Sequence, residues 1–308
     1  MKTNYLLAAA VLLAVSPLTA HAQTATPVPA SPALASAAQP LTLRLKFTPG
    51  QTLYYSMTTD TNGTMLTGQS GAGMPIQIHM QMLMHQTVKE VRASDGAATI
   101  DVGIDTMSMG MSGQTMPIPP EKMAQMKTIG TMVILPTGKT VSFTPSSALS
   151  TSGPMPGMDL SHTNAMGSMG QFPDAPVKIG DTWKSAIAAG MMGMQVASAF
   201  SLTSLDAADG KTVAIIHQTT NGTFGGPGAD GAAAPGPMGM KMSGTVKGTG
   251  TLRFDVDAGT VLGQTSQADV AMTMTPPGAT EPMKMQMKAH STLARASAPA
   301  PVANPAVQ

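Results

Sequence analysis

Two stretches of the chain place soft ligand atoms at spacings that a metal site could use. The first is IQIHMQMLMH at residues 76–85, where methionine and histidine recur among isoleucine and glutamine. The second runs over residues 155–169 and spaces Met158, His162 and Met166 four residues apart. Thioether and imidazole ligands suit Cu(I), so both stretches raise the question of a copper site.

The first stretch has the period of a β-strand. Met80, Met82 and Met84 share one parity, whereas His79 and His85 share the other. Alternate side chains of a strand point to opposite faces, and these two histidines would lie about 20 Å apart along it. We therefore predict a strand whose core face is built from methionine, which is close to leucine in volume, rather than a metal site.

The second stretch has the spacing of a helix. At helical periodicity Met158, His162 and Met166 fall on one stripe, which Met155 and Met169 extend. The central three could coordinate one copper ion, or the stripe could be the apolar face of a short helix that packs on a sheet. We prefer packing, because such stripes usually face a core, and keep these three as the candidate metal ligands. We expect no other cofactor.

Groups that could carry catalysis are scarce. The chain has no cysteine, and its only glutamates, Glu90, Glu121 and Glu281, form no close pair in the sequence. Neither the G-x-S-x-G nor the H-E-x-x-H motif occurs. Asp255 and Asp257 flank a turn without the rest of a calcium loop, so we expect them to be turn acceptors. We predict a protein that is not an enzyme and name no catalytic or ligand-binding residue.

The first 22 residues have the pattern of an export signal. Lys2 precedes the apolar run YLLAAAVLLAV, and AHA at 20–22 is a small-x-small cleavage site. We expect cleavage near Ala22, a periplasmic or secreted protein, and no transmembrane segment in the mature chain. The net charge of +1 and the 11% of charged residues argue against nucleic acid as a partner.

Alternation of apolar and polar residues dominates the chain between an Ala/Pro-rich linker at 23–40 and a tail at 296–308. Both ends have compositions typical of disorder. The alternation predicts an all-β, mainly antiparallel fold with hairpin turns at Asp95-Gly96, Thr137-Gly138, Asp209-Gly210 and Ala258-Gly259. We expect a flexible loop at 225–237 and one or two short helices, at 119–127 and within 151–171.

An internal repeat organises these strands. PGQTLYYSM (49–57) matches IGDTWKSAI (179–187), and GTMVILPTGKTVSF (130–143) matches GTLRFDVDAGTVLG (250–263). We predict a duplicated β-meander with repeats at 41–150 and 172–295. The repeats could form one extended curved sheet or two half-barrels.

The entry to the second repeat, FPDAPVKIGDTW (172–183), can be compared with known families together with LRLKFTPGQTLYYSM (43–57) and FDVDAGTV (254–261). These stretches resemble an uncharacterised bacterial family of exported antiparallel β proteins, known as a domain of unknown function. The resemblance extends over residues 41–294 and implies an antiparallel architecture similar to the curved sheets of periplasmic lipoprotein carriers. It carries over no catalytic residue.

Three functions fit these observations. A methionine-rich β surface suits an apolar ligand, a lipid or an envelope partner, because unbranched methionine adapts to varied shapes. A periplasmic copper-binding protein is the first alternative. A structural envelope protein whose methionines absorb oxidants is the second.

Overall fold

The computed structural model describes residues 39–66, 73–116, 118–146, 171–189, 194–208, 210–225, 241–275 and 282–299. Antiparallel strands dominate these residues and form one 12-stranded sheet, which confirms the all-β fold class. The helix expected at 119–127 is α1 (Pro120–Met126), and the helix expected within 151–171 lies outside the described residues. The strands are β1 (Thr52–Leu66), β2 (Gly73–Val91), β3 (Ala98–Met111), β4 (Gln114–Met116), β5 (Gly130–Ile134), β6 (Thr140–Pro145), β7 (Thr182–Ala189), β8 (Met194–Ala208), β9 (Lys211–Phe224), β10 (Lys241–Asp255), β11 (Thr260–Thr275) and β12 (Met283–Ala296).

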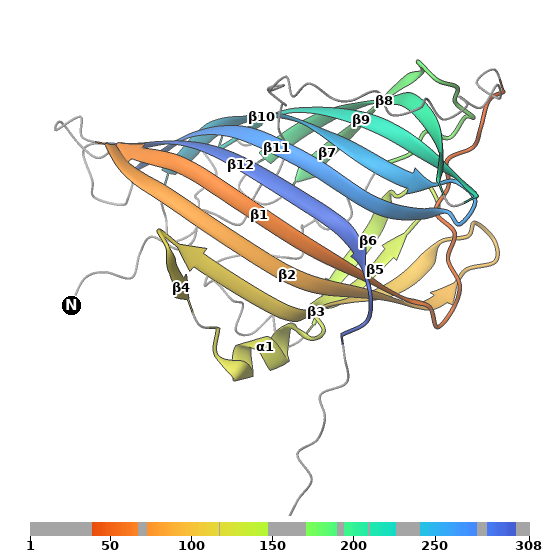
Figure 1. The fold of residues 1–308 in the computed structure, drawn as a ribbon, viewed down its shortest axis with the longest axis horizontal. Helices are drawn as coiled ribbons and strands as arrows, with labels where there is room; N and C mark the ends of the chain where they lie inside the picture. Colours follow the sequence, from red (N-terminus) through yellow and green to blue (C-terminus); the bar gives the residue numbers. More distant parts are fainter. Residues whose placement is uncertain are drawn as a thin grey trace, which may run out of the picture.

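The sheet is continuous rather than split into two half-barrels. Its strand order is β6-β5-β3-β2-β1-β12-β11-β10-β9-β8-β7, with β4 added beside β3. The two halves of the chain join where β1 pairs antiparallel with β12. The sheet curls, so that β5 and β6 lie behind the long front strands (Figure 1), and β6 and β7 remain its two ends.

The two halves begin with the same local structure. The amide of Gly50 donates to the carbonyl of Val88, and the amide of Gly180 donates to the carbonyl of Leu202. Both glycines have positive φ, at 80° and 93°, a conformation that is unfavourable for residues with a Cβ. In each half the glycine therefore lies in the same kind of turn, just before the first strand, and its amide bonds the second strand.

Irregularities in the sheet also recur at matching positions. The register shifts twice between β2 and β3, once between β8 and β9, and once in each of the hairpins β5–β6 and β10–β11. Bulges of this kind are specific features that bend a strand, so their recurrence supports an internal duplication. The corresponding pairs are Val88/Glu90 with Leu202/Ser204, and Val133/Ile134 with Arg253/Phe254.

Two bridging segments, residues 41–47 and 171–177, close one end of the curled sheet. They pair with each other at Leu41 and Val177. The amide of Leu45 donates to Pro136 in the β5–β6 turn, and the amide of Lys46 donates to Gly259 in the β10–β11 turn. The bridging segments thus tie together turns from the two halves of the sheet.

The main core lies on the concave face, beside the bridging segments. This aliphatic and aromatic core joins side chains of β1, β2, β3 and β5 with those of β8, β9, β10 and β11. Strands so far apart in the sheet order touch only across a concave surface. Leu43 of the first bridging segment and Phe254 of β10 are fully buried in this core, and the Phe172 and Phe254 rings lie 4.5 Å apart.

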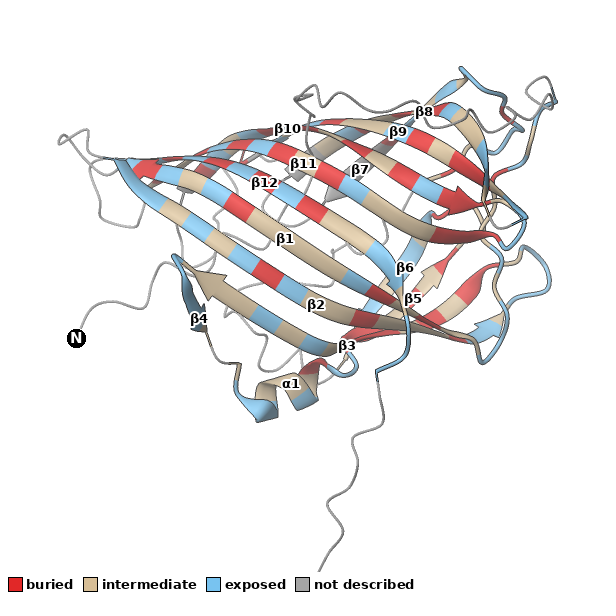
Figure 2. Cartoon of the chain, viewed as in Figure 1, coloured by how far each residue is buried: buried red, intermediate tan, exposed pale blue. Residues whose placement is uncertain are grey.

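A second cluster lies toward the other end of the long strands. This methionine cluster carries its buried side chains on β1, β10, β11 and β12. Figure 2 shows the alternation of buried and exposed residues along β11 and β12 that the sequence pattern predicts. Its methionines are Met65, Met242, Met272, Met274, Met285 and Met287.

Asp95 in the β2–β3 turn gives a pH-dependent prediction. Arg92 donates from Nε to Oδ1 at 2.8 Å and from Nη2 to Oδ2 at 2.6 Å, and the Ala97 amide adds a bond of 3.1 Å. The Arg92 hydrogen bonds are the main cause that lowers the pKa of Asp95 from 3.8 to about 2. Because the folded-state pKa is the lower one, the resulting stability is present above pH 3.8 and is lost as the pH falls through about 2.

We expect the carboxyl ¹³C resonance of Asp95 to titrate with a midpoint near pH 2. Arg92→Gln should move the midpoint upward, toward the ordinary value of an aspartate. A midpoint near 3.8 in the wild type would show that the Arg92 contact does not persist in solution.

Candidate functional site: the concave face of the sheet

Strand β2 places the IQIHMQMLMH methionines on the concave face. Met80 and Met84 are 6% and 8% exposed and Met82 is partly buried, whereas His79 is exposed on the opposite face. Met84 lies beside Tyr55 of β1 in the sheet register. Met74 has the same parity but is 54% exposed at the start of the strand, so the buried face is shorter than the sequence pattern indicates.

The two histidines of this stretch pair with carboxylates on the convex face. His79 Nδ1 lies 2.6 Å from Asp60 on β1, and His85 Nδ1 lies 2.9 Å from Asp105 on β3. Sequence reasoning missed both pairs, because the partners meet only through the cross-strand register. Within the parts of the chain that the structure describes, no three His, Cys, Asp or Glu residues gather as metal ligands.

The candidate copper ligands Met158, His162 and Met166 lie outside the described residues, so the copper site stays a prediction. The turn aspartates are described. Asp255 Oδ1 accepts from the Ala258 amide at 2.7 Å, and Asp257 Oδ2 accepts from the Thr212 amide at 2.8 Å. Asp255 therefore acts as a turn acceptor, as the sequence predicts, whereas Asp257 bonds the start of β9 rather than its own turn.

The methionine cluster is built by register. Met285 of β12 lies between Met65 of β1 and Met272 of β11, and Met242 of β10 lies beside Met274 of β11. All five side chains are 4–6% exposed. Valine and isoleucine are the usual residues of buried strands, whereas methionine has an unbranched side chain that changes shape readily. The cluster is therefore a buried apolar region whose side chains can change conformation at little cost.

Hydroxyl and amide groups cross the concave face between the two apolar clusters. Ser198 Oγ and Thr220 Oγ1 lie 2.9 Å apart, and Gln218 Nε2 donates to both, at 3.3 and 3.2 Å. Farther along, Thr59 Oγ1 and Ser291 Oγ lie 2.6 Å apart. Sequence reasoning did not single out this polar belt, which consists of Thr59, Thr61, Ser185, Ser198, Gln218, Thr220, Gln264, Ser266 and Ser291.

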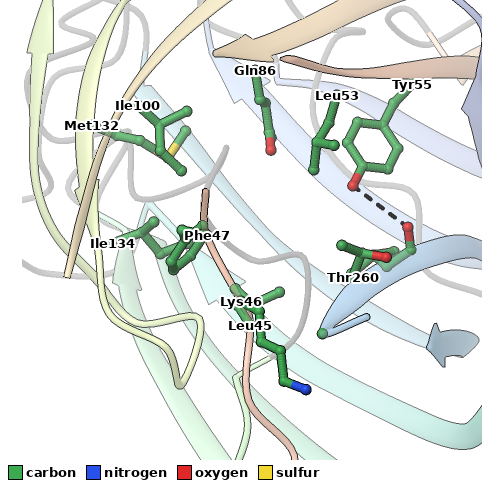
Figure 3. Close-up of a pocket in the computed structure, with 12 residues that line it drawn as sticks. Leu45, Lys46, Phe47, Leu53, Tyr55, Gln86, Ile100, Met132, Ile134 and Thr260 are labelled. Carbon is green, nitrogen blue, oxygen red and sulfur yellow. Dashed lines mark hydrogen bonds between the residues drawn. The ribbon is translucent and has the colours of Figure 1, made fainter. Parts of the chain in front are cut away.

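A pocket of about 40 Å³ lies under the first bridging segment. Phe47 and Ile134 face Leu53 and Tyr55 across it (Figure 3). Tyr55 is 3% exposed and donates to the Val261 carbonyl at 3.5 Å. Burial raises the pKa of the Tyr55 phenol, and the charge of the nearby Arg295 offsets part of the effect. The pocket holds water-sized molecules, because sites for drug-sized ligands occupy about 300–1,000 Å³.

These features define a class of protein: an open, curled antiparallel sheet with a methionine-rich concave face. Residues 162–262 match the model of a family of unknown function, DUF6263. The match includes two of the three stretches that carry the resemblance, at 172–183 and 254–261, and leaves out 43–57. The resemblance to a domain of unknown function is thereby confirmed. It is confirmed over residues 162–262, a shorter range than the 41–294 that the sequence motifs suggest.

A search of curated proteins finds no match to this sequence. Three solved structures are similar in part. Lipovitellin, in a structure of its lipid–protein interactions, has 8% identity and a TM-score of 0.46 over 84% of this chain, which spans only 26% of lipovitellin. DynF from the dynemicin biosynthesis pathway of Micromonospora chersina has 8% identity and a TM-score of 0.23, over 90% of this chain and 95% of its own. A LolA superfamily protein from Nitrosomonas europaea has 9% identity and a TM-score of 0.13, over 83% and 90%.

We draw no function from these similarities, since identity and TM-score are low in each case. The structure adds one observation about membranes. Among the described segments, no helix has the length and hydrophobicity that crossing a bilayer requires.

Proposed function

We propose that this chain is an exported, non-enzymatic protein that binds an apolar small molecule, such as a lipid, against the methionine side of its concave face. The methionine cluster is the observation that carries the proposal. Its methionines lie side by side on β1, β10, β11 and β12, and Ile76 of β2 packs against them, whereas Met84 of β2 belongs to the main core. The signal-like pattern of residues 1–22 supports a periplasmic or extracellular location.

The chemistry of the two faces favours an apolar occupant. The neighbouring positions on the convex face carry Asp60, Asp269, Lys284 and Lys288, whose charges stay in water. The concave face presents thioether and aliphatic groups instead, and burying the chain of a lipid against them is favourable by roughly 25 cal/mol per Å². The pocket of about 40 Å³ lies under the first bridging segment and not at the methionine cluster. Because the cluster methionines are only 4–7% exposed, binding there requires their side chains to repack.

The test is a fluorescence titration with N-phenyl-1-naphthylamine, a neutral apolar probe. We expect saturable binding by the wild type. Met272→Gln/Met285→Gln places two polar groups at adjacent buried positions and should weaken binding about tenfold or more. Val141→Gln changes an exposed apolar residue on the end strand β6, away from the cluster, and should leave binding unchanged.

A second variant separates binding from folding. Met272→Leu/Met285→Leu keeps the side-chain volume, so its melting temperature should stay close to that of the wild type, while the stiffer leucines should weaken binding by a few-fold. Absence of saturable binding by the wild type would overturn the proposal. Native mass spectrometry of the purified protein would then show whether a protein partner occupies the face instead.

A further inference from the structure

Small side chains form a continuous row across the concave face. Starting from β7, each residue of the row lies beside the next in the sheet register, through β8, β9, β10, β11 and β12 to β1. No side chain in the row is larger than threonine, and every residue of the row is buried. The row is Ser185, Ser198, Thr220, Gly248, Ala268, Ala289 and Thr61.

The hydroxyls at the two ends of the polar belt find partners within the protein. On β8 and β9, Ser198 and Thr220 bond each other and Gln218, whose Oε1 accepts from Gln264 Nε2 at 3.2 Å. On β1 and β12, Thr59 bonds Ser291. These groups are satisfied and need no ligand.

Thr61 and Ser266 differ from the rest of the belt. They are 5% and 7% exposed, and neither hydroxyl makes a side-chain hydrogen bond to a described residue. Both belong to the concave face, on β1 and β11, with only β12 between them. Neighbouring strands are about 4.8 Å apart, so the two hydroxyls stand on strands roughly 10 Å apart. Neither oxygen is among the fully buried polar atoms that lack a partner, so both hydroxyls keep some accessible surface and are free to bond a group that enters from the concave side.

The belt also excludes charge. Two register rows hold every member of the belt except Gln264. Among the described residues, the positions of these rows from β7 to β2 carry no Asp, Glu, Lys, Arg or His. An ionised carboxylate or phosphate here would lose its hydration without meeting an opposite charge. Hydroxyl groups, in contrast, can donate to and accept from an uncharged ester, amide or alcohol.

We infer that the polar belt selects ligands in which an apolar chain carries an uncharged head group with more than one hydrogen-bonding atom, and that Thr61 and Ser266 bind different atoms of this head group. The inference rests on the proposed function and deepens it, because it names the class of ligand. The chain of the ligand lies against the methionine cluster, next to the belt, and its polar group meets the two unpartnered hydroxyls.

Competition against the naphthylamine probe tests the inference with three ligands of equal chain length at pH 9: monoolein, which is uncharged, oleate, which is an anion, and 1-octadecene, which has no polar group. We expect monoolein to displace the probe about tenfold better than either of the others. Oleate binding as well as monoolein, or 1-octadecene doing so, would overturn the inference while the proposed function stands. Failure of the probe itself to bind would overturn both.

Two substitutions assign the hydroxyls. Thr61→Val and Ser266→Ala remove them at nearly constant shape, so each should reduce the preference for monoolein over 1-octadecene about fivefold and leave probe binding unchanged. Thr61→Ser keeps the hydroxyl and should show the same preference for monoolein over 1-octadecene as the wild type. Thr64→Val, an exposed position on the same strand, is the control. Removal of an unpartnered hydroxyl should not lower the melting temperature, whereas removal of a structural hydrogen bond would.

The infrared ester band of bound monoolein gives an independent reading. A hydrogen bond from Thr61 or Ser266 shifts the carbonyl stretch to lower frequency, and the double variant Thr61→Val/Ser266→Ala should return it to the position of an unbonded ester. An unshifted band in the wild type, or the same shift in the double variant, would show that these hydroxyls do not bind the polar group.

Discussion

Replacing Phe254 with alanine is expected to lower the free energy of unfolding by about 3–5 kcal/mol. Phe254 is completely buried, and its ring lies 4.5 Å from that of Phe172 in the second bridging segment. It sits at the bulge where β10 meets β11, so its loss removes contacts to both the sheet and the bridging segment. Alanine would leave a cavity that the two antiparallel halves cannot close without moving their strands.

Urea unfolding followed by circular dichroism measures this loss. Phe143→Ala is the matched control, because it removes the same atoms from a partly buried position on the end strand β6 and should cost less than half as much. A loss below about 1 kcal/mol for Phe254→Ala would show that the second bridging segment does not pack on the sheet in solution.

The local elements of this fold follow from the sequence. Alternation predicts the strands, and glycine predicts the turns: Gly96, Gly138, Gly210 and Gly259 all have positive φ at hairpin ends. These features depend on residues close together in the chain. The helix at 119–127 is equally local, since a proline start and methionines three apart suffice to indicate it.

The continuity of the sheet could not be predicted in the same way. It depends on the pairing of β1 with β12, whose partners Tyr54 and Ala296 stand at opposite ends of the described chain. No local pattern specifies such a pairing, so one sheet and two half-barrels remained equal alternatives. The register of this pairing also decides that Thr61 faces inward beside Ala289.

The polar belt could not be predicted from the sequence for a related reason. Threonine and serine are common on both faces of a strand, and the alternation of β1 places Thr59 and Thr61 without showing that the face is concave. The curl of the sheet, which depends on bulges and on the bridging segments, turns this face into an interior. The His79–Asp60 pair was missed because it too exists only through register.

Gly259→Ala is expected to lower the free energy of unfolding by about 2–4 kcal/mol. Gly259 has φ +63°, and an L-residue with a Cβ pays about 1–2 kcal/mol in this region. A Cβ at this position would also lie 2.7 Å from the backbone nitrogen of Lys46, which donates to the Gly259 carbonyl at 3.0 Å. The substitution therefore strains the turn and pushes away the first bridging segment.

Gly210→Ala separates these two causes. Gly210 has φ +73°, close to that of Gly259, but a Cβ there would meet no atom within 4 Å. It should show the conformational cost alone, and the difference between the two variants, about 1–2 kcal/mol, measures what the contact of Lys46 with the β10–β11 turn contributes. Equal losses of unfolding free energy in the two variants would mean that the first bridging segment moves away at no cost in stability. In that case Leu43, which the same segment carries into the core, would also tolerate alanine, and the closed end of the curled sheet would be open in solution.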